Sequence, residues 1–181
     1  MAIKKATGNK FCLFLAIVVF AILLTSCGSS SSSDDYAKSI NLELIHALNN
    51  KDSDLLKSMM SIRTKNVVVE DLDAQISQLF EFIDMNGTEI KDENIIRSEC
   101  MLRHTVSERN RYYDYIRCDL RIKLDNGKQY YFFTHTYRTN SDNSSVGAEK
   151  IMCFDVTDYV FKEGEVTIDT KGLEYVLVGE R

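Results

Sequence analysis

The chain has 181 residues, of which 44% are hydrophobic and 27% charged, a composition typical of one globular domain. Residues 1–26 hold three of the 22 Lys and Arg and none of the 27 Asp and Glu, so 19 basic residues face 27 acidic ones in the remainder. This balance argues against a nucleic-acid partner, whose phosphates must be neutralised by Lys and Arg, and against attachment to an anionic membrane surface by charge alone.

The N-terminus has the layout of a secretory signal peptide. Lys4, Lys5 and Lys10 precede an unbroken apolar run from Phe11 to Leu24. That run is shorter than the ~20 apolar residues that a helix needs to span a bilayer. A basic stretch followed by a short apolar one is typical of a signal peptide. We therefore expect this segment to direct the chain out of the cytoplasm.

The apolar run ends in Leu24-Thr25-Ser26-Cys27, where a conventional signal peptide would end in A-x-A. These four residues resemble the bacterial lipobox, in which an aliphatic residue and two small residues precede an obligatory cysteine. The resemblance implies a bacterial lipoprotein whose Cys27 sulfur receives a diacylglycerol. It also implies that the chain is cut before Cys27 and that the new amino group is often acylated. Two or three acyl chains supply the double anchor that stable membrane attachment requires.

The stretch from Gly28 to Asp35 contains no apolar residue and is typical of a flexible tether. We therefore expect a signal peptide in residues 1–26, a lipidated cysteine with a Ser-rich tether in 27–35, and a single α+β domain in 36–181. The protein would be lipid-anchored at the cell membrane and face outside the cytoplasm. The alternative is an uncleaved N-terminal membrane helix in which Cys27 has no special role.

Three helices are predicted at the start of the domain. From Tyr36 to Leu48, apolar residues recur every four positions, which is the period of a helix face. Asp52 is placed to cap a second, short helix, and Asp71 is placed to cap a third. Gly87 supplies the left-handed residue that commonly ends a helix.

Beyond Gly87 the apolar pattern has a period of two, which predicts strands. One strand has its inward residues between Ile96 and Val106, and the next has them between Ile116 and Leu124. A further strand is expected near residues 148–158. The tail, residues 172–178, adds a last strand or packs across the sheet.

Asn126-Gly127 predicts a hairpin with a two-residue type I′ turn. The register that follows from this turn sets Cys118 opposite His135. It also places four side chains on the apolar face: Tyr131, Phe133, His135 and Tyr137.

This order of elements predicts an α+β domain with three N-terminal helices packed on a curved antiparallel sheet of about four strands. The order resembles the cystatin-like cone of the nuclear-transport-factor-like superfamily. More closely, it resembles a family of uncharacterised bacterial lipoproteins built on that fold. The resemblance rests on the lipobox, on the stretches NKDSDLLKSMMS and DLDAQISQLFEFIDMNGT, and on long strands ending in GLEYVLV. In that superfamily the sheet and helices often enclose a pocket with varied uses, so the resemblance implies a fold rather than a function.

Three cysteines other than Cys27 belong to the mature chain: Cys100, Cys118 and Cys153. If residues 107–111 form a five-residue hairpin loop, Cys100 lies directly opposite Cys118, and an oxidising compartment permits a disulfide. Direct cross-strand pairs suit disulfide geometry poorly. Buried free thiols are therefore the favoured interpretation, with the disulfide as the alternative. No two cysteines have zinc-site spacing, so no metal is predicted.

The histidines offer a candidate catalytic set. The same loop sets Asp114 opposite His104, and the hairpin register brings His135 and Tyr137 to the same face. A histidine paired with an aspartate in an enclosed pocket can act as a general base, because the carboxylate fixes the imidazole tautomer. The favoured alternative is two histidines at the edge of the core that are satisfied by polar neighbours. The sequence has no glycine-rich phosphate loop or nucleophile elbow, and it predicts no cofactor.

Arginines are concentrated on the two strands before the hairpin, with acidic residues between them. They are Arg97, Arg103, Arg109, Arg111, Arg117 and Arg121. The solvent face of the sheet is therefore expected to mix cations with aromatic rings. Such a face is either simply solvated, with cross-strand pairs, or a protein-contact surface, because Arg and Tyr are enriched in interface cores.

These features predict a lipid-anchored binding or protein-interaction module outside the cytoplasm. It would use either a pocket under the helices or the outer face of the sheet. The alternative is a small-molecule enzyme that uses His104, Asp114 and His135. An enclosed polar cavity of ~300 Å³ or more would favour a small-molecule site, whereas a filled core would favour protein contact.

Overall fold

The computed structural model describes residues 31–67, 71–83, 85, 87–106, 112–140, 146–162, 165 and 168–179. The predicted signal peptide, Cys27 and the first part of the tether lie outside these residues. Of the helices that the structure describes, none is both long enough and apolar enough to cross a membrane.

Four α-helices precede the sheet in the described part of the chain, where the sequence predicts three. They are α2 (Ser31–Asn50), α3 (Ser53–Met59), α4 (Ile62–Val67) and α5 (Leu72–Phe82), followed by a short 3-10 helix, η1 (Asp92–Asn94). The predicted cap of α3 is confirmed, because Asp52 Oδ1 accepts a hydrogen bond from the Leu55 N–H at 2.9 Å. The additional helix, α4, has its own cap: Ser61 Oγ accepts a hydrogen bond from the Thr64 N–H at 3.0 Å.

The third predicted helix is α5, and it begins after Asp71 as expected. The Asp71 side chain, however, makes no capping hydrogen bond. Gly87 has the predicted left-handed backbone, with φ 79°, but α5 has already ended at Phe82. The inward residues of α5 follow the helical period: Leu72, Ile76 and Leu79 are all buried.

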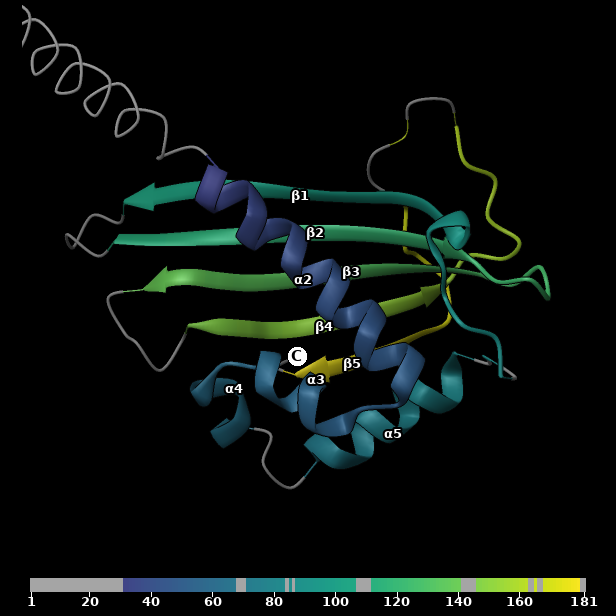
Figure 1. Ribbon diagram of the computed structural model, residues 1–181, viewed down its shortest axis with the longest axis horizontal. Helices are drawn as coiled ribbons and strands as arrows, with labels where there is room; N and C mark the ends of the chain where they lie inside the picture. The colour runs from purple at the N-terminus through teal and green to yellow at the C-terminus, as the bar shows by residue number, and fades with distance from the viewer. Residues whose placement is uncertain are drawn as a thin grey trace, which may run out of the picture. The chain divides into compact units, whose positions relative to one another are not determined.

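Five antiparallel strands form one sheet in the order β1-β2-β3-β4-β5 (Figure 1). They are β1 (Ile95–Val106), β2 (Tyr112–Lys123), β3 (Gln129–Asn140), β4 (Gly147–Asp155) and β5 (Tyr175–Gly179). The α+β class is therefore confirmed. The sheet has one strand more than the four predicted, because the tail pairs with β4 and sets Tyr175 opposite Phe154.

The pairing of β1 with β2 follows the predicted register. Cys100 lies opposite Cys118, and His104 lies opposite Asp114. The inward residues of β2 alternate with charged ones, so a slip by one residue would turn those charges toward the helices. Ile116 is completely buried on that inward side.

The predicted register between β2 and β3 is wrong by one residue, since Cys118 lies opposite Thr134. The cause is the turn. Gly127 donates its N–H to the Leu124 carbonyl at 2.9 Å, and Leu124 donates its own to the Lys128 carbonyl at 2.8 Å. The loop therefore has three residues and ends in a left-handed Gly127, φ 89°. This is the three-residue hairpin with a glycine bulge, not the two-residue type I′ turn.

The shift turns each side chain of β3 to the opposite face from the predicted one. Four residues predicted to be solvated or mixed with charges now face the helices: Tyr130, Phe132, Thr134 and Thr136. All four are buried. The residues predicted to join the apolar face, Tyr131, Phe133, His135 and Tyr137, lie on the far side.

The helices cover one face of the sheet, here called the inner face (Figure 1). The core between the two layers includes Leu44, Leu56, Ile76, Leu79, Leu120, Phe132 and Ile151. These residues come from three helices and three strands, so the inner face holds the main apolar core of the domain.

The opposite face, here called the outer face, carries an apolar cluster of its own. Tyr131 and Phe154 of the sheet pack there with Val156, Tyr159 and Phe161. These last three belong to the segment between β4 and β5, of which the structure describes residues 156–162, 165 and 168–174; we call it the C-terminal segment. It leaves β4 at the end of the sheet where the β2–β3 hairpin lies (Figure 1).

Candidate functional site

Two neighbouring strands gather polar and aromatic side chains on the outer face. β2 contributes Tyr115, Arg117, Asp119 and Arg121, and β3 contributes Tyr131, Phe133, His135 and Tyr137. The half near the hairpin lies under the C-terminal segment; we call it the covered half, and it holds Arg121, Tyr131 and Phe154. The other half, here called the open half, holds Tyr115, His135 and Tyr137. Arg117 and Phe133 lie at the boundary between the two halves.

A buried carboxylate organises this boundary. Asp119, whose side chain is 6% exposed, accepts hydrogen bonds from Arg117 Nε at 3.1 Å and from Arg117 Nη2 at 3.1 Å. The Tyr131 hydroxyl also donates to Asp119. Burial, and then the neighbouring Asp119, raise the pKa of Tyr131 to about 12. The phenol therefore stays protonated at neutral pH, and the three side chains form one satisfied cluster.

The open half contains three rings that pack on one another. The Tyr115 and His135 rings are 5.1 Å apart between centroids and nearly perpendicular, at 87°. Tyr137 lies 6.5 Å from Tyr115 and 5.4 Å from His135. Edge-to-face contacts of this kind stabilise aromatic pairs beyond the area they bury. The rings therefore hold one another in a fixed arrangement while each stays partly exposed.

The His135 imidazole is neutral at neutral pH. Burial, and then Lys150, lower its pKa below the ordinary value. Its Nδ1 lies 3.4 Å from Glu149 Oε2. Since the ring carries no charge, this is a polar contact of a neutral imidazole rather than an ion pair. The open half therefore presents a neutral imidazole beside two tyrosine rings.

A cavity of about 200 Å³ lies at the boundary, between the sheet and the C-terminal segment. We call it the socket. Its lining includes Arg117, Phe133, Met152, Phe154 and Ile168. The Arg117 guanidinium lies 4.9 Å from the centre of the Phe133 ring and is already paired with Asp119. The socket therefore suits an apolar group more than a second carboxylate.

The covered half uses similar side chains to hold the chain's own segment. The Arg121 guanidinium stacks on Phe161, 3.8 Å from the ring centre. Arg97 Nη1 donates to the Glu165 carbonyl at 2.7 Å, and the Tyr159 hydroxyl donates to Glu165 Oε1 at 2.8 Å. These contacts account for the aromatic and cationic side chains of this half.

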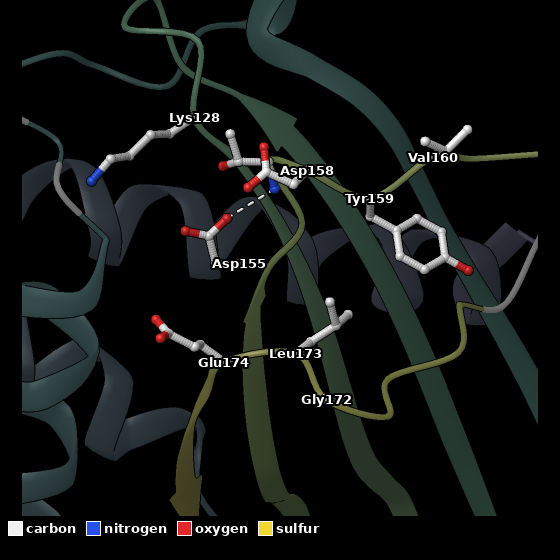
Figure 2. Close-up of a pocket in the computed structure, with 9 residues that line it drawn as sticks. Lys128, Asp155, Asp158, Tyr159, Val160, Gly172, Leu173 and Glu174 are labelled. Carbon is white, nitrogen blue, oxygen red and sulfur yellow. Dashed lines mark hydrogen bonds between the residues drawn. The ribbon is translucent and has the colours of Figure 1, made fainter.

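Figure 2 shows a separate hollow of about 560 Å³ at the hairpin end of the sheet. Asp155, Asp158 and Glu174 line it beside Lys128, and Asp155 accepts a hydrogen bond from the Thr157 N–H at 2.9 Å. Val160 on its edge is 85% exposed, so the hollow is a surface depression. Within the described ranges, no group of three or more His, Cys, Asp or Glu could hold a metal ion.

The structure does not assemble the predicted catalytic set. Asp114 is buried on the inner face, 7% exposed, whereas His135 and Tyr137 lie on the outer face. His104 pairs with Asp114 along the backbone, but its side chain lies outside the described residues. The sheet thus separates Asp114 from the two residues that were predicted to join it, and the cause is the one-residue shift at the hairpin.

Cys100 and Cys118 form a disulfide between β1 and β2, with Cα atoms 4.1 Å apart. The favoured interpretation from the sequence, two buried free thiols, therefore differs from the structure. The closest pairs of an antiparallel ladder bring their Cα atoms to about 4.5 Å, which lets opposed sulfurs meet. Cys153 is free and buried, and burial raises the pKa of its thiol well above the ordinary value. It is therefore an unreactive core residue.

Sequence reasoning missed the Asp119–Tyr131 pair, the ring cluster and the covering segment. One signal was present: Tyr130-Tyr131-Phe132-Phe133 has no apolar–polar alternation. An unbroken apolar run indicates a strand that is buried on both faces. Such a strand requires a cover on the outer face, and the C-terminal segment provides it.

Residues 43–158, more than half of the chain, match the sequence model of a family described as "Domain of unknown function (DUF5104)". No curated protein matches the chain.

Proposed function

The chain belongs to this family of domains of unknown function, and we propose that it is a lipid-anchored module outside the cytoplasm that binds a protein partner through the open half and the socket. The observation that carries this proposal is the packed cluster of Tyr115, His135 and Tyr137 beside the socket. The three rings contact one another, and each stays partly exposed.

The residue types of this surface support protein contact. Tyr, Phe, Met and Arg are enriched in interface cores, and a small number of such anchors carries most of the binding energy. Met101 lies opposite Arg117 at the edge of the surface and is 44% exposed. The rings are held in place before a partner arrives, which lowers the entropy lost on binding.

The lipid anchor is proposed from the lipobox and the tether. Cys27 would carry the acyl chains, and residues 28–35 would let the domain stand clear of the bilayer. Labelling with a clickable fatty acid checks this assignment: the native chain should take up label, and Cys27→Ala should not. Equal labelling of both chains would contradict it.

We also assign the domain to the cystatin-like cone. Helices on one face of a five-stranded antiparallel sheet, with the long hairpin strands β2 and β3 at its centre, support this assignment. The enzyme alternative has no comparable support, because Asp114 and His135 lie on opposite faces of the sheet.

Site-specific photo-crosslinking in the producing cells tests the proposed partner. A benzophenone amino acid placed at Tyr137 should give a discrete crosslinked product with another protein. The matched control places the same probe at Leu42, which is 62% exposed on α2, and this should give no such product. Crosslinking that is absent at Tyr137, or equal at both positions, would contradict the proposal.

A further inference from the structure

A second cavity lies on the inner face, separate from the outer face on which the proposed function rests. It has a volume of about 260 Å³ and lies between α2, α3, the end of β3 and the start of β4. We call it the α2 cavity. Its polar walls are formed by Tyr36, Ser39, Glu43, Ser58 and Thr136.

Thr136 has an unsatisfied hydroxyl on this wall. Thr136 is only 3% exposed, and its Oγ1 atom has no hydrogen-bond partner within the described residues. Buried polar atoms are nearly always paired, because leaving one unpaired costs free energy. Thr134, two residues earlier on the same strand, is equally buried and unsatisfied but does not line the cavity. It is therefore a matched reference for Thr136.

Two serines leave acceptors on the cavity wall. Ser39 Oγ donates its proton to the Tyr36 carbonyl, and Ser58 Oγ donates to the Leu55 carbonyl, each at 2.7 Å. A hydroxyl has one proton, so both oxygens keep only lone pairs for a ligand. Glu43 is the one charged side chain among the described lining residues. The wall therefore matches a cation with several N–H donors.

The remaining wall is apolar and includes Ile40, Met59 and Met60. Such a surface suits a short alkyl stem. The Arg138 guanidinium lies 6.0 Å from the centre of the Tyr36 ring, and Arg138 is not among the residues that line the cavity. The volume is below the ~300 Å³ at which drug-sized pockets begin, so the ligand is small.

The far side of the cavity is fixed by the backbone. Ser61 donates its N–H to the Ala148 carbonyl at 2.9 Å, which ties the α3–α4 junction to β4. Gly147, at φ 116°, lets the two backbones approach, because an added Cβ would lie 2.9 Å from Ser61 N. The cavity is therefore preformed and does not need a ligand to open it.

We propose that the α2 cavity binds a short-chain amino alcohol, with its ammonium group at Glu43 and the serine oxygens and its hydroxyl at Thr136. The alkyl stem lies against Ile40 and Met59. An ammonium supplies three donors to the acceptors of the wall, and the ligand hydroxyl completes the hydrogen bonding of Thr136. This ligand class follows from the negative charge of Glu43 and from the hydrogen-bond acceptors on the wall.

Three probes of similar size separate the parts of this proposal: 4-amino-1-butanol, butylamine and 4-hydroxybutyrate. Titration of the full chain in detergent, followed by NMR or calorimetry, should rank the amino alcohol first and butylamine second. The anion should bind about tenfold more weakly than the amino alcohol, because its carboxylate meets Glu43. Equal Kd values for the three probes, or no saturable binding of the amino alcohol, would overturn the proposal.

Two threonine variants separate the cavity from the surrounding core. Thr136→Val and Thr134→Val each remove an unsatisfied hydroxyl, so each should raise the Tm of the free protein by about 2–4 °C. Thr136→Val should weaken the amino alcohol about fivefold and leave butylamine unchanged. Thr134→Val should change neither Kd.

Glu43→Gln should weaken both amines about fivefold. Binding that is unaffected by both Thr136→Val and Glu43→Gln would place the probes elsewhere and overturn the proposal. None of these variants touches the outer face, so crosslinking from Tyr137 would proceed as before. The two proposals can therefore fail independently.

Discussion

The two halves of the outer face use the same kinds of side chain for different ends. In the covered half, Arg121 stacks on Phe161, and Tyr131 is buried under the chain's own C-terminal segment. In the open half, Tyr115, His135 and Tyr137 pack on one another, and each stays partly exposed. Composition alone does not distinguish the halves.

The chain covers one half of this aromatic–cationic sheet face with its own C-terminal segment. Side chains in the covered half contribute to the stability of the fold. Under the proposed function, side chains in the open half contribute less to stability and would contact a partner. Variants in the two halves should therefore differ in whether they affect unfolding or binding.

The largest effect is expected at the boundary, where Asp119 holds Arg117 and Tyr131. Asp119→Ala leaves a partly buried guanidinium and a buried phenol without their shared acceptor, which should cost about 3 kcal/mol. Urea unfolding measures this. The control is Glu99→Ala, which removes the ion pair between Arg97 and Glu99. The Glu99 side chain is 54% exposed, so this change should cost less than about 1 kcal/mol. Equal losses of unfolding free energy in the two variants would contradict the role of Asp119 as the shared acceptor.

The cover itself is tested by Phe161→Ala. This change removes the ring that packs on Arg121 and should lower the free energy of unfolding by about 2 kcal/mol, because the ring is partly buried. Val160→Ala, next to it and 85% exposed, should have almost no effect. If neither variant changes the unfolding midpoint, the segment does not stabilise the covered half.

Tyr131 gives the covered half a distinctive dependence on alkaline pH. Its pKa is raised to about 12 in the folded protein, above the ordinary value near 10. The stability that it contributes is therefore complete below pH ~10 and is lost as the pH rises through ~12. Tyr131→Phe should cost about 1 kcal/mol at neutral pH and progressively less between pH ~10 and ~12. A cost that does not change over this range would contradict the burial of the phenol.

The smallest effect on stability is expected in the open half. Tyr137→Ala should cost less than about 1 kcal/mol, because the ring is partly exposed and its contacts with Tyr115 and His135 are weak. The same change should nevertheless reduce crosslinking of a benzophenone probe at the neighbouring Tyr115 at least about fivefold. Unchanged crosslinking would mean that the ring cluster is not a contact site.

Sequence patterning was sufficient for some elements and misleading for others. The β1–β2 register followed from the five-residue loop assumed at residues 107–111, and the α3 cap followed from Asp52. The predicted hairpin register was wrong because Asn126-Gly127 fits two types of turn. Only tertiary packing decides between a two-residue and a three-residue loop. That one residue places His135 and Tyr137 on the face opposite Asp114.

The C-terminal segment illustrates a second limit. Its contacts depend on Phe161 and Glu165, which lie far along the chain from Arg121 and Arg97. No local period encodes such long-range contacts. The disulfide illustrates a third limit. The sequence predicts that Cys100 lies opposite Cys118, but free thiols were favoured because the separation of the two Cα atoms depends on the ladder geometry.

Hydroxyl-radical footprinting on intact producing cells and on the purified protein shows whether the open half is covered by a partner in the cell. If the open half binds a partner, Tyr115, Tyr137 and Met101 should react less in cells than in the purified protein. Tyr175, which is 55% exposed outside the open half, should react equally in both. Equal reactivity of all four residues in the two settings would contradict the claim that the open half is a binding surface.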